Sequence, residues 1–208
     1  VVRYFQEFET MRAQIQSGGI GEPGYVKVTR GGIFPTGAGK WFSDYEQSGG
    51  VTFDCMIHDL DWVRYVFGEP ERIFCQTLMS ELTSGQPLDY SQVTMRMKCG
   101  VIAKIIGTWA HPSGFRVTAE ACGSGGMLQF DSAVSSLGAM MRETGKGPGM
   151  IVPESPVDVS PYELEWGEFL AWIESGATPR VTAHDALRAV EMVEAALESA
   201  KLKQPVNL

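Results

Sequence analysis

Four polar side chains recur at nearly helical spacing in the middle of the chain, namely Asp54, His58, Asp61 and Tyr65. In a helix over residues 51–67 they would fall within about 60° of one another, at about 100° per residue. An imidazole flanked by carboxylates can be oriented, held in one tautomer and tuned toward neutral pH, as a general base requires. The spacing therefore makes His58 a candidate acid/base and Asp54 its candidate partner.

The same spacing fits two other interpretations. A charged helix face that only meets solvent is common, and for a bare D-x-x-x-H-x-x-D pattern it is the more frequent outcome. His and Asp one turn apart can also chelate a metal ion, as in a metal-dependent hydrolase using Asp54 and His58. Because further His or Cys ligands are not evident nearby, we rank the metal site below the other two and expect no bound metal. Spacing alone does not decide the matter.

The composition is that of an ordinary globular protein. The chain has 208 residues, 44% of them hydrophobic and 20% charged, and a formal net charge of −8. No apolar run approaches the roughly 18 residues of a membrane span. The basic residues are scattered in an acidic chain, which argues against a groove for nucleic acid. We therefore expect no membrane and no nucleic acid as partner, but a small molecule or a protein surface.

The cysteines favour a reducing compartment. None of the four forms a metal-type C-x-x-C pair, and each lies in an apolar or strand-like context. Free thiols of this kind are typical of reducing surroundings. We therefore expect a cytoplasmic location. The four residues are Cys55, Cys75, Cys99 and Cys122.

The elements that position the candidate site follow from hydrophobic periodicity. The chain opens with a strand feeding a helix, continues through a second strand and a glycine-rich loop, and enters an unbroken helix that carries His58. Short turns between the later period-two segments favour an antiparallel meander. The predicted ranges are 1–3 (strand), 5–16 (helix), 25–30 (strand), 31–39 (loop), 51–67 (helix), and 72–78, 92–99, 101–109, 115–122 and 127–131 (strands).

The last third of the chain is irregular and then helical. Residues 133–156 lack a clear period and predict an irregular excursion with one short strand. Ser160-Pro161 and Thr182 each carry the signature of a helix start, and amphipathic helices follow both. A sheet of five or more strands with helices on one face results. The predicted fold class is α+β, a mostly antiparallel, open-faced β-sheet with helices packed on one face.

The surrounding residues carry a resemblance to a known family. The segment W-F-S-D-Y-E-Q-S-G-G-V-T-F-D-C-M-I-H-D-L-D-W-V-R-Y-V-F-G-E-P, residues 41–70, resembles the Gly-Gly then D-x-x-x-H-x-x-D signature of the glucose-fructose oxidoreductase / inositol dehydrogenase (Gfo/Idh/MocA) family. The opening R-Y-F with S-G-G-I-G-E-P-G, and the closing helices with G-x-x-P-R-V-T and A-x-x-A-L-E-S-A, are also similar to this family. Essentially the whole chain is covered.

The resemblance implies a two-domain oxidoreductase of which residues 1–208 are the C-terminal substrate-binding and oligomerisation domain. The reaction would be hydride transfer between NAD or NADP and a sugar, cyclitol or related polyol. The cofactor would be bound mainly by an N-terminal Rossmann domain, whose G-x-G-x-x-G turn this sequence does not contain. Since the chain opens V-V-R-Y-F without Met, we expect it to be part of a longer protein and to be inactive alone.

Site residues follow from the matched positions. The resemblance makes His58 the acid/base that takes the substrate hydroxyl proton, and Asp54 the residue that holds the substrate or His58. Substrate contacts are also expected from Asp61, Arg3, Tyr4 and Trp41. For Arg3 and Tyr4, a structural ion pair at the domain junction is an equal alternative. For Trp41, a core position is the commoner fate of an aromatic ring.

Assembly is the last expectation. Large apolar residues lie on both faces of the strand over residues 101–109, so the open sheet face predicts a partner subunit, as a homodimer or homotetramer. The alternative to an enzyme is a non-catalytic ligand-binding or dimerisation module of the same fold, because fold does not fix function.

Overall fold

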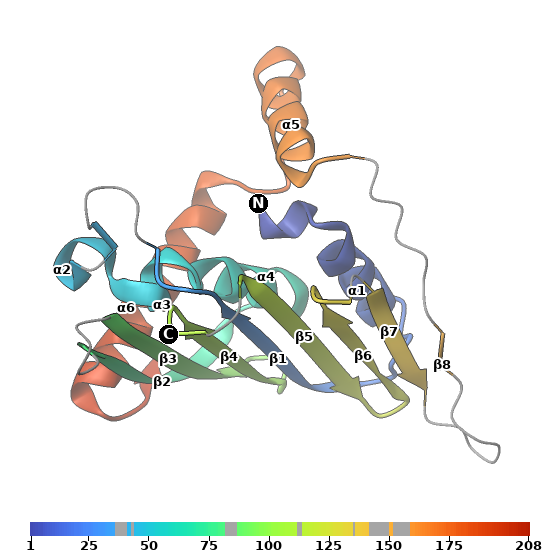
Figure 1. Ribbon diagram of the computed structural model, residues 1–208. Coiled ribbons are helices and arrows are strands. Elements are labelled where there is room, and N and C mark those ends of the chain that lie inside the picture. The colour runs from blue at the N-terminus through green and yellow to red at the C-terminus, as the bar shows by residue number, and fades with distance from the viewer. Residues whose placement is uncertain are drawn as a thin grey trace.

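The computed structural model describes residues 1–35, 41–42, 44–81, 87–111, 114–134, 136–141, 150–151 and 159–208. These residues form one α+β fold in which helices cover one side of a β-sheet (Figure 1). The helices are η1 (Val2–Tyr4, a 3-10 turn), α1 (Gln6–Gln16), α2 (Tyr45–Ser48), α3 (Gly50–Asp54), α4 (Ile57–Phe67), α5 (Pro161–Ser175) and α6 (Ala183–Leu202). The predicted fold class is confirmed.

The described strands form a single nine-stranded sheet in the order β8-β7-β6-β5-β1-β4-β3-β2-β9. All neighbours are antiparallel except β1 and β4, which run parallel with Val28 opposite Ile105. The strands are β1 (Pro23–Gly31), β2 (Pro70–Glu81), β3 (Pro87–Met97), β4 (Ile102–Thr108), β5 (Arg116–Gly123), β6 (Gly126–Asp131), β7 (Ser136–Met141), β8 (Met150–Ile151) and β9 (Val206–Asn207).

The core lies between the sheet and the helices. Side chains along β1, β4 and β5 alternate between buried and more exposed positions, so one sheet face packs on the helices and the other stays open. Phe8 of α1 is central to this packing. Its ring centroid lies 5.0 Å from that of Trp62 of α4 and 5.8 Å from that of Phe130 of β6. Helix α6 packs along α4 and β2, where Ser199 accepts a hydrogen bond from the Cys75 backbone N–H.

Two local predictions are wrong. Residues 1–3 do not form a strand but enter η1, which packs with α5 and α4. The helix predicted over residues 51–67 is not continuous, because it is broken at Cys55 and Met56 into α3 and α4. In the region 133–156, the structure describes strands β7 and β8, while residues 135, 142–149 and 152–156 lie outside the described part, as do residues 36–39 of the predicted loop.

Helix α5 stands apart from the other helices. It projects from the body (Figure 1), and none of its residues is buried. It contacts the rest of the described chain mainly through η1. No helix that the structure describes is both long and apolar enough to cross a membrane. The exposed apolar residues of α5 are Tyr162, Leu164, Trp166, Phe169, Leu170, Trp172 and Ile173.

Candidate active site

The break between α3 and α4 sets the geometry of the candidate site. Met56 is fully buried and packs with Val51 against Gly107 of β4. A Cβ at position 107 would lie 2.5 Å from Met56 Cγ and 3.2 Å from Val51 Cγ2, so only glycine permits this approach. The offset at Cys55 therefore lets both α3 and the start of α4 press onto the sheet.

His58, in the first turn of α4, opens into a pocket of about 330 Å³. Its side chain is exposed at the surface, yet the walls of the pocket withdraw water from the ring. This desolvation lowers the pKa of His58, and the positive charge of Arg30 lowers it further. A neutral imidazole that can accept a proton is therefore favoured. The pocket is lined by Val1, Val2, Phe5, Arg30, Pro35, Phe42, Asp54, Cys55, His58, Trp109, Phe115 and Tyr162.

Asp54, at the end of α3, shares this pocket with His58. Burial raises the pKa of the Asp54 carboxyl, and the Trp109 indole opposes part of that rise. Trp109 Nε1 is itself buried without a hydrogen bond of normal geometry to the rest of the described chain. Among the described residues no hydrogen bond joins Asp54 to His58, so the two side chains present separate groups to a ligand.

Asp61 and Arg3 bind each other rather than line the pocket. Arg3 is 2% exposed and donates to Asp61 from Nε at 2.8 Å and from Nη2 at 2.5 Å. The guanidinium of Arg3 also lies 4.4 Å above the Tyr65 ring. The face expected to hold Asp54, His58, Asp61 and Tyr65 together is thus divided, because Arg3 engages Asp61 and Tyr65 while Asp54 and His58 line the pocket.

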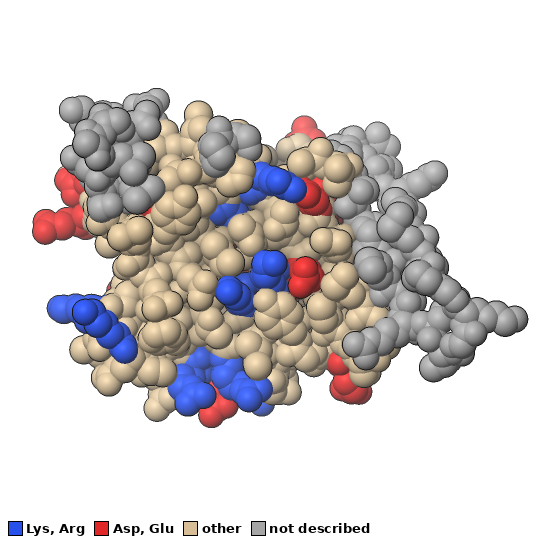
Figure 2. Space-filling view, turned by 60° about the horizontal axis from the view of Figure 1, so that its bottom comes forward, with Lys and Arg blue, Asp and Glu red and all other residues tan. Residues whose placement is uncertain are grey.

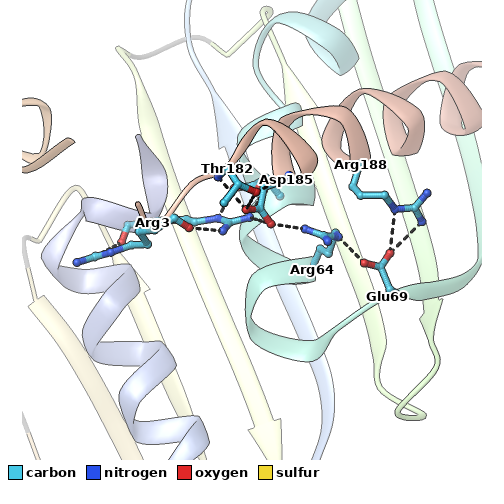
Figure 3. A network of polar contacts seen from close by, with 8 residues as sticks. Arg3, Arg64, Glu69, Thr182, Asp185 and Arg188 are labelled. Carbon is cyan, nitrogen blue, oxygen red and sulfur yellow. Dashed lines mark hydrogen bonds and ion pairs between the residues drawn. The ribbon is translucent and has the colours of Figure 1, made fainter. Parts of the chain in front are cut away.

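Arg3 belongs to a chain of charges that crosses α4 and α6 (Figure 3). Asp185 accepts from Arg64 at 2.8 Å and lies 3.2 Å from Arg3, while Arg64 and Arg188 both donate to Glu69. Asp185 also closes the capping box of α6 with Thr182. These partners lower the pKa of the Asp185 carboxyl well below its ordinary value, although burial acts in the opposite direction. These ion pairs and hydrogen bonds link η1, α4 and α6 to one another.

The two remaining expected site residues lie outside the pocket wall. Tyr4 is buried and its hydroxyl donates to Glu168 of α5 at 2.9 Å. Burial, followed by the hydrogen bond to Glu168, raises the pKa of Tyr4. Trp41 is partly exposed and packs edge-on against Phe42, which reaches the pocket in its place.

Sequence reasoning missed a buried ion pair beside His58. Arg30 of β1 and Asp59 of α4 are buried, and Arg30 Nε donates to Asp59 Oδ2 at 2.9 Å and Nη2 to Oδ1 at 2.6 Å. The sequence held a signal, because Arg30 continues the inward positions of Val26 and Val28 in an alternating strand. A cation at an inward position needs a buried partner.

Trp109 and Tyr162 were also missed as pocket residues. Both read as core or helix aromatics from the sequence, and only the fold brings the end of β4 and the start of α5 to the same hollow. A second hollow of about 320 Å³ adjoins the first and shares four lining residues with it, Val2, Phe5, Arg30 and Phe115.

The described residues contain no cluster of three His, Cys, Asp or Glu side chains placed to hold a metal ion. The four cysteines, all in the described part of the chain, form no disulfide, and Cys55 borders the pocket. Burial raises the pKa of Cys55 to about 12. This thiol is therefore protonated near neutral pH and is a poor nucleophile.

Known proteins match the chain along its whole length. It is 26% identical to the myo-inositol 2-dehydrogenase of Thermotoga maritima, over 99% of this chain and 62% of that protein. It is 25% identical to the scyllo-inositol 2-dehydrogenase (NAD(+)) of Bacillus subtilis, over 99% of this chain and 60% of that protein. The chain thus spans about three fifths of these relatives.

Solved structures share the fold. An oxidoreductase from Agrobacterium radiobacter, in complex with NAD+, L-tartaric acid and magnesium, superposes with a TM-score of 0.75 at 18% identity, over 99% of this chain and 62% of that one. The family described as the GFO/IDH/MocA C-terminal domain matches residues 8–129, more than half of the sequence. This chain belongs to the GFO/IDH/MocA C-terminal domain family.

Proposed function

We propose that this chain is the substrate-binding part of an NAD(P)-dependent oxidoreductase acting on a polyol, such as a cyclitol or sugar. The observation that carries the proposal is that His58, whose pKa is lowered, lies in one pocket with Asp54 and with the Trp109 indole N–H, which makes no hydrogen bond of normal geometry within the described chain. A hydroxyl-rich substrate offers groups for all three, because each hydroxyl both donates and accepts. Two inositol dehydrogenases among the relatives support this substrate class.

In the proposed reaction His58 accepts the proton of the hydroxyl that is oxidised. Asp54 accepts a hydrogen bond from a neighbouring hydroxyl, and Trp109 Nε1 donates one. The aromatic walls, among them Phe42 and Phe115, exclude water and lie against the apolar face of the ring. The proton and the hydride thus leave the same carbinol group in different directions.

A nicotinamide bound beside this pocket would supply the acceptor for the hydride of the substrate carbon. The pocket fits the substrate side of this reaction, since it is open, lined by rings and holds a proton acceptor. We assign the cofactor mainly to the remainder of a longer protein, because the curated relatives extend well beyond the matched part. Residues 1–208 are then one domain, and the exposed stripe of α5, which begins at Tyr162 on the pocket rim, is a surface for that remainder.

His58→Ala in the full-length protein tests the proposal. A panel of inositols and sugars is screened with NAD and NADP, and turnover of the best substrate is measured. Loss of general-base action is expected to lower kcat by about 10² to 10⁴-fold. The matched control is His184→Ala, which removes the exposed imidazole in the first turn of α6, outside the pocket. A kcat unchanged by His58→Ala would remove His58 from the mechanism, whereas binding of polyols without any turnover would favour a non-catalytic binding module.

A further inference from the structure

The buried carboxylate of Asp89, on β3, lies at the start of α3, the short helix that ends at Asp54. Asp89 is 1% exposed, and its Oδ2 accepts a hydrogen bond from the Val51 backbone N–H at 2.7 Å. Gly49, the N-cap residue of α3, has no side chain with which to accept such a bond. Asp89 therefore supplies, from a neighbouring strand, the cap that α3 lacks locally.

Gly50 shows how closely this contact is fitted. Its φ is +64°, in the left-handed region that glycine adopts readily. A Cβ at this position would lie 3.0 Å from Asp89 Oδ2 and 3.1 Å from Met79 Sδ. The second glycine of the Gly-Gly pair thus lets the backbone of α3 reach the carboxylate.

The backbone of Asp89 bonds to the end of β4, next to which Trp109 lines the pocket. Its carbonyl oxygen accepts hydrogen bonds from Thr108 Oγ1 at 2.9 Å and from the Trp109 N–H at 3.0 Å. Trp109 and Asp54 both line the pocket that contains His58. One residue of β3 therefore bonds to the two segments that carry these groups.

We propose that Asp89 is a positioning residue for the pocket, which fixes the start of α3, and through it the Asp54 carboxylate, against the end of β4 that carries Trp109. The activity readout of this proposal rests on the proposed function, whereas its structural readout does not. Asp89 forms no ion pair with a cation of the described chain. Burial, together with the negative charge of Asp54, raises the pKa of Asp89 to about 6, although the hydrogen bond from the Val51 N–H opposes part of this rise. A carboxylate in such surroundings opposes stability, which is typical of residues that serve a site.

Two substitutions separate the cap from general packing. Asp89→Ala removes the acceptor for the Val51 N–H, whereas Asp89→Asn retains an acceptor oxygen without the charge. The matched control is Ser91→Ala, two residues along on the same buried side of β3 and 2% exposed. Amide exchange of peptides covering residues 49–56 and the kinetics of the full-length protein are measured for all three.

Asp89→Ala is expected to speed exchange in these peptides about tenfold, as for loss of a helix cap. It is expected to lower kcat by about 10 to 100-fold through misplacement of Asp54. Asp89→Asn should recover both values to within about threefold, and Ser91→Ala should change neither by more than about twofold. Should Asp89→Ala fail to fold, Asp89→Ser, whose shorter side chain withdraws the acceptor, takes its place with the same expectations.

The proposal is overturned if Asp89→Ala leaves exchange in residues 49–56 at the Ser91→Ala value, or if kcat falls no further than in that control. Its failure differs from failure of the proposed function. If His58→Ala keeps full turnover while Asp89→Ala loses it, the role of His58 falls and the positioning role of Asp89 stands.

Discussion

At the scale of single residues, the site depends on an imidazole whose surroundings disfavour its charge. Desolvation and the charge of Arg30 both lower the pKa of His58. Arg30 stays charged because Asp59, buried with it, accepts several hydrogen bonds from its guanidinium. Arg30 therefore lowers the pKa of His58 through space, while Asp59 partly opposes it.

The lowered pKa gives a pH prediction. We expect kcat/KM for alcohol oxidation to fall at acid pH with a midpoint below 6.5, the ordinary value for histidine. Protonation removes the lone pair that accepts the hydroxyl proton, so the active form is the neutral one above this midpoint. The measurement is a pH profile of the full-length protein, with His58→Gln as the variant that should lack this limb. A midpoint above 6.5 in the unmodified protein would contradict the assignment.

At the scale of elements, the contact between the α3–α4 break and β4 should be intolerant of added volume. We expect Gly107→Ala to lower the free energy of unfolding by about 1–3 kcal/mol, since its methyl group meets Met56 at 2.5 Å. Urea unfolding measures this change. Gly24→Ala in β1, where an added Cβ meets no atom within 4 Å, is the control and should stay within about 0.5–1 kcal/mol. Equal effects of both substitutions would refute the contact.

The charge network of η1, α4 and α6 gives a second prediction at this scale. Asp61→Ala leaves the buried Arg3 guanidinium without two of its charge-assisted hydrogen bonds, although Asp185 and the Arg180 carbonyl remain. We expect a loss of about 2–3 kcal/mol in the free energy of unfolding. Urea unfolding of Asp61→Ala beside Glu174→Ala, which removes an exposed carboxylate of α5, measures it. A difference of less than about 0.5 kcal/mol between the two would count against the network.

How far the sequence predicted these elements depends on the range of the contacts. The strands from β2 to β6 and the capped helix α6 follow from local periodicity and from the Thr182–Asp185 capping box, and the structure confirms them. The break in the 51–67 helix does not follow from local periodicity, because it lies where Met56 packs against Gly107, which is distant in sequence. The parallel pairing of β1 with β4 is likewise set by the tertiary fold.

The same distinction applies to the site. Asp54 and His58 were found because their spacing is local, and the structure places both in one pocket. Asp61 does not line that pocket, because it binds Arg3, which is distant in sequence. Trp109 and Tyr162 reach the pocket only through the fold of the chain ends. Local patterns therefore locate the helix that carries the proposed acid/base but not the other walls of the pocket.

At the scale of the whole molecule, the described residues expose apolar side chains on two surfaces. One is the apolar stripe of α5, and the other is the outer face of the sheet, on which Ile102, Lys104 and Ile106 of β4 point away from the helices. Figure 2 shows the underside of the molecule, where uncharged side chains cover most of the surface and Lys and Arg groups are dispersed among them. Exposed apolar groups over a broad, even sheet are typical of a subunit interface.

We therefore expect the full-length protein to assemble through this outer sheet face, as a dimer or tetramer. Sedimentation at about 10 µM should give a mass of at least two chains, because obligate assemblies bury large apolar areas and persist at such concentrations. The double variant Ile102→Glu, Ile106→Glu places two carboxylates in the interface and should yield monomers, since an unpaired charge is costly to bury. Leu187→Glu, at an exposed position of α6, is the control and should leave the assembly intact. A monomeric unmodified protein, or an oligomer that survives the double variant, would show that the sheet face is open to solvent and that the apolar residues of β4 serve no interface.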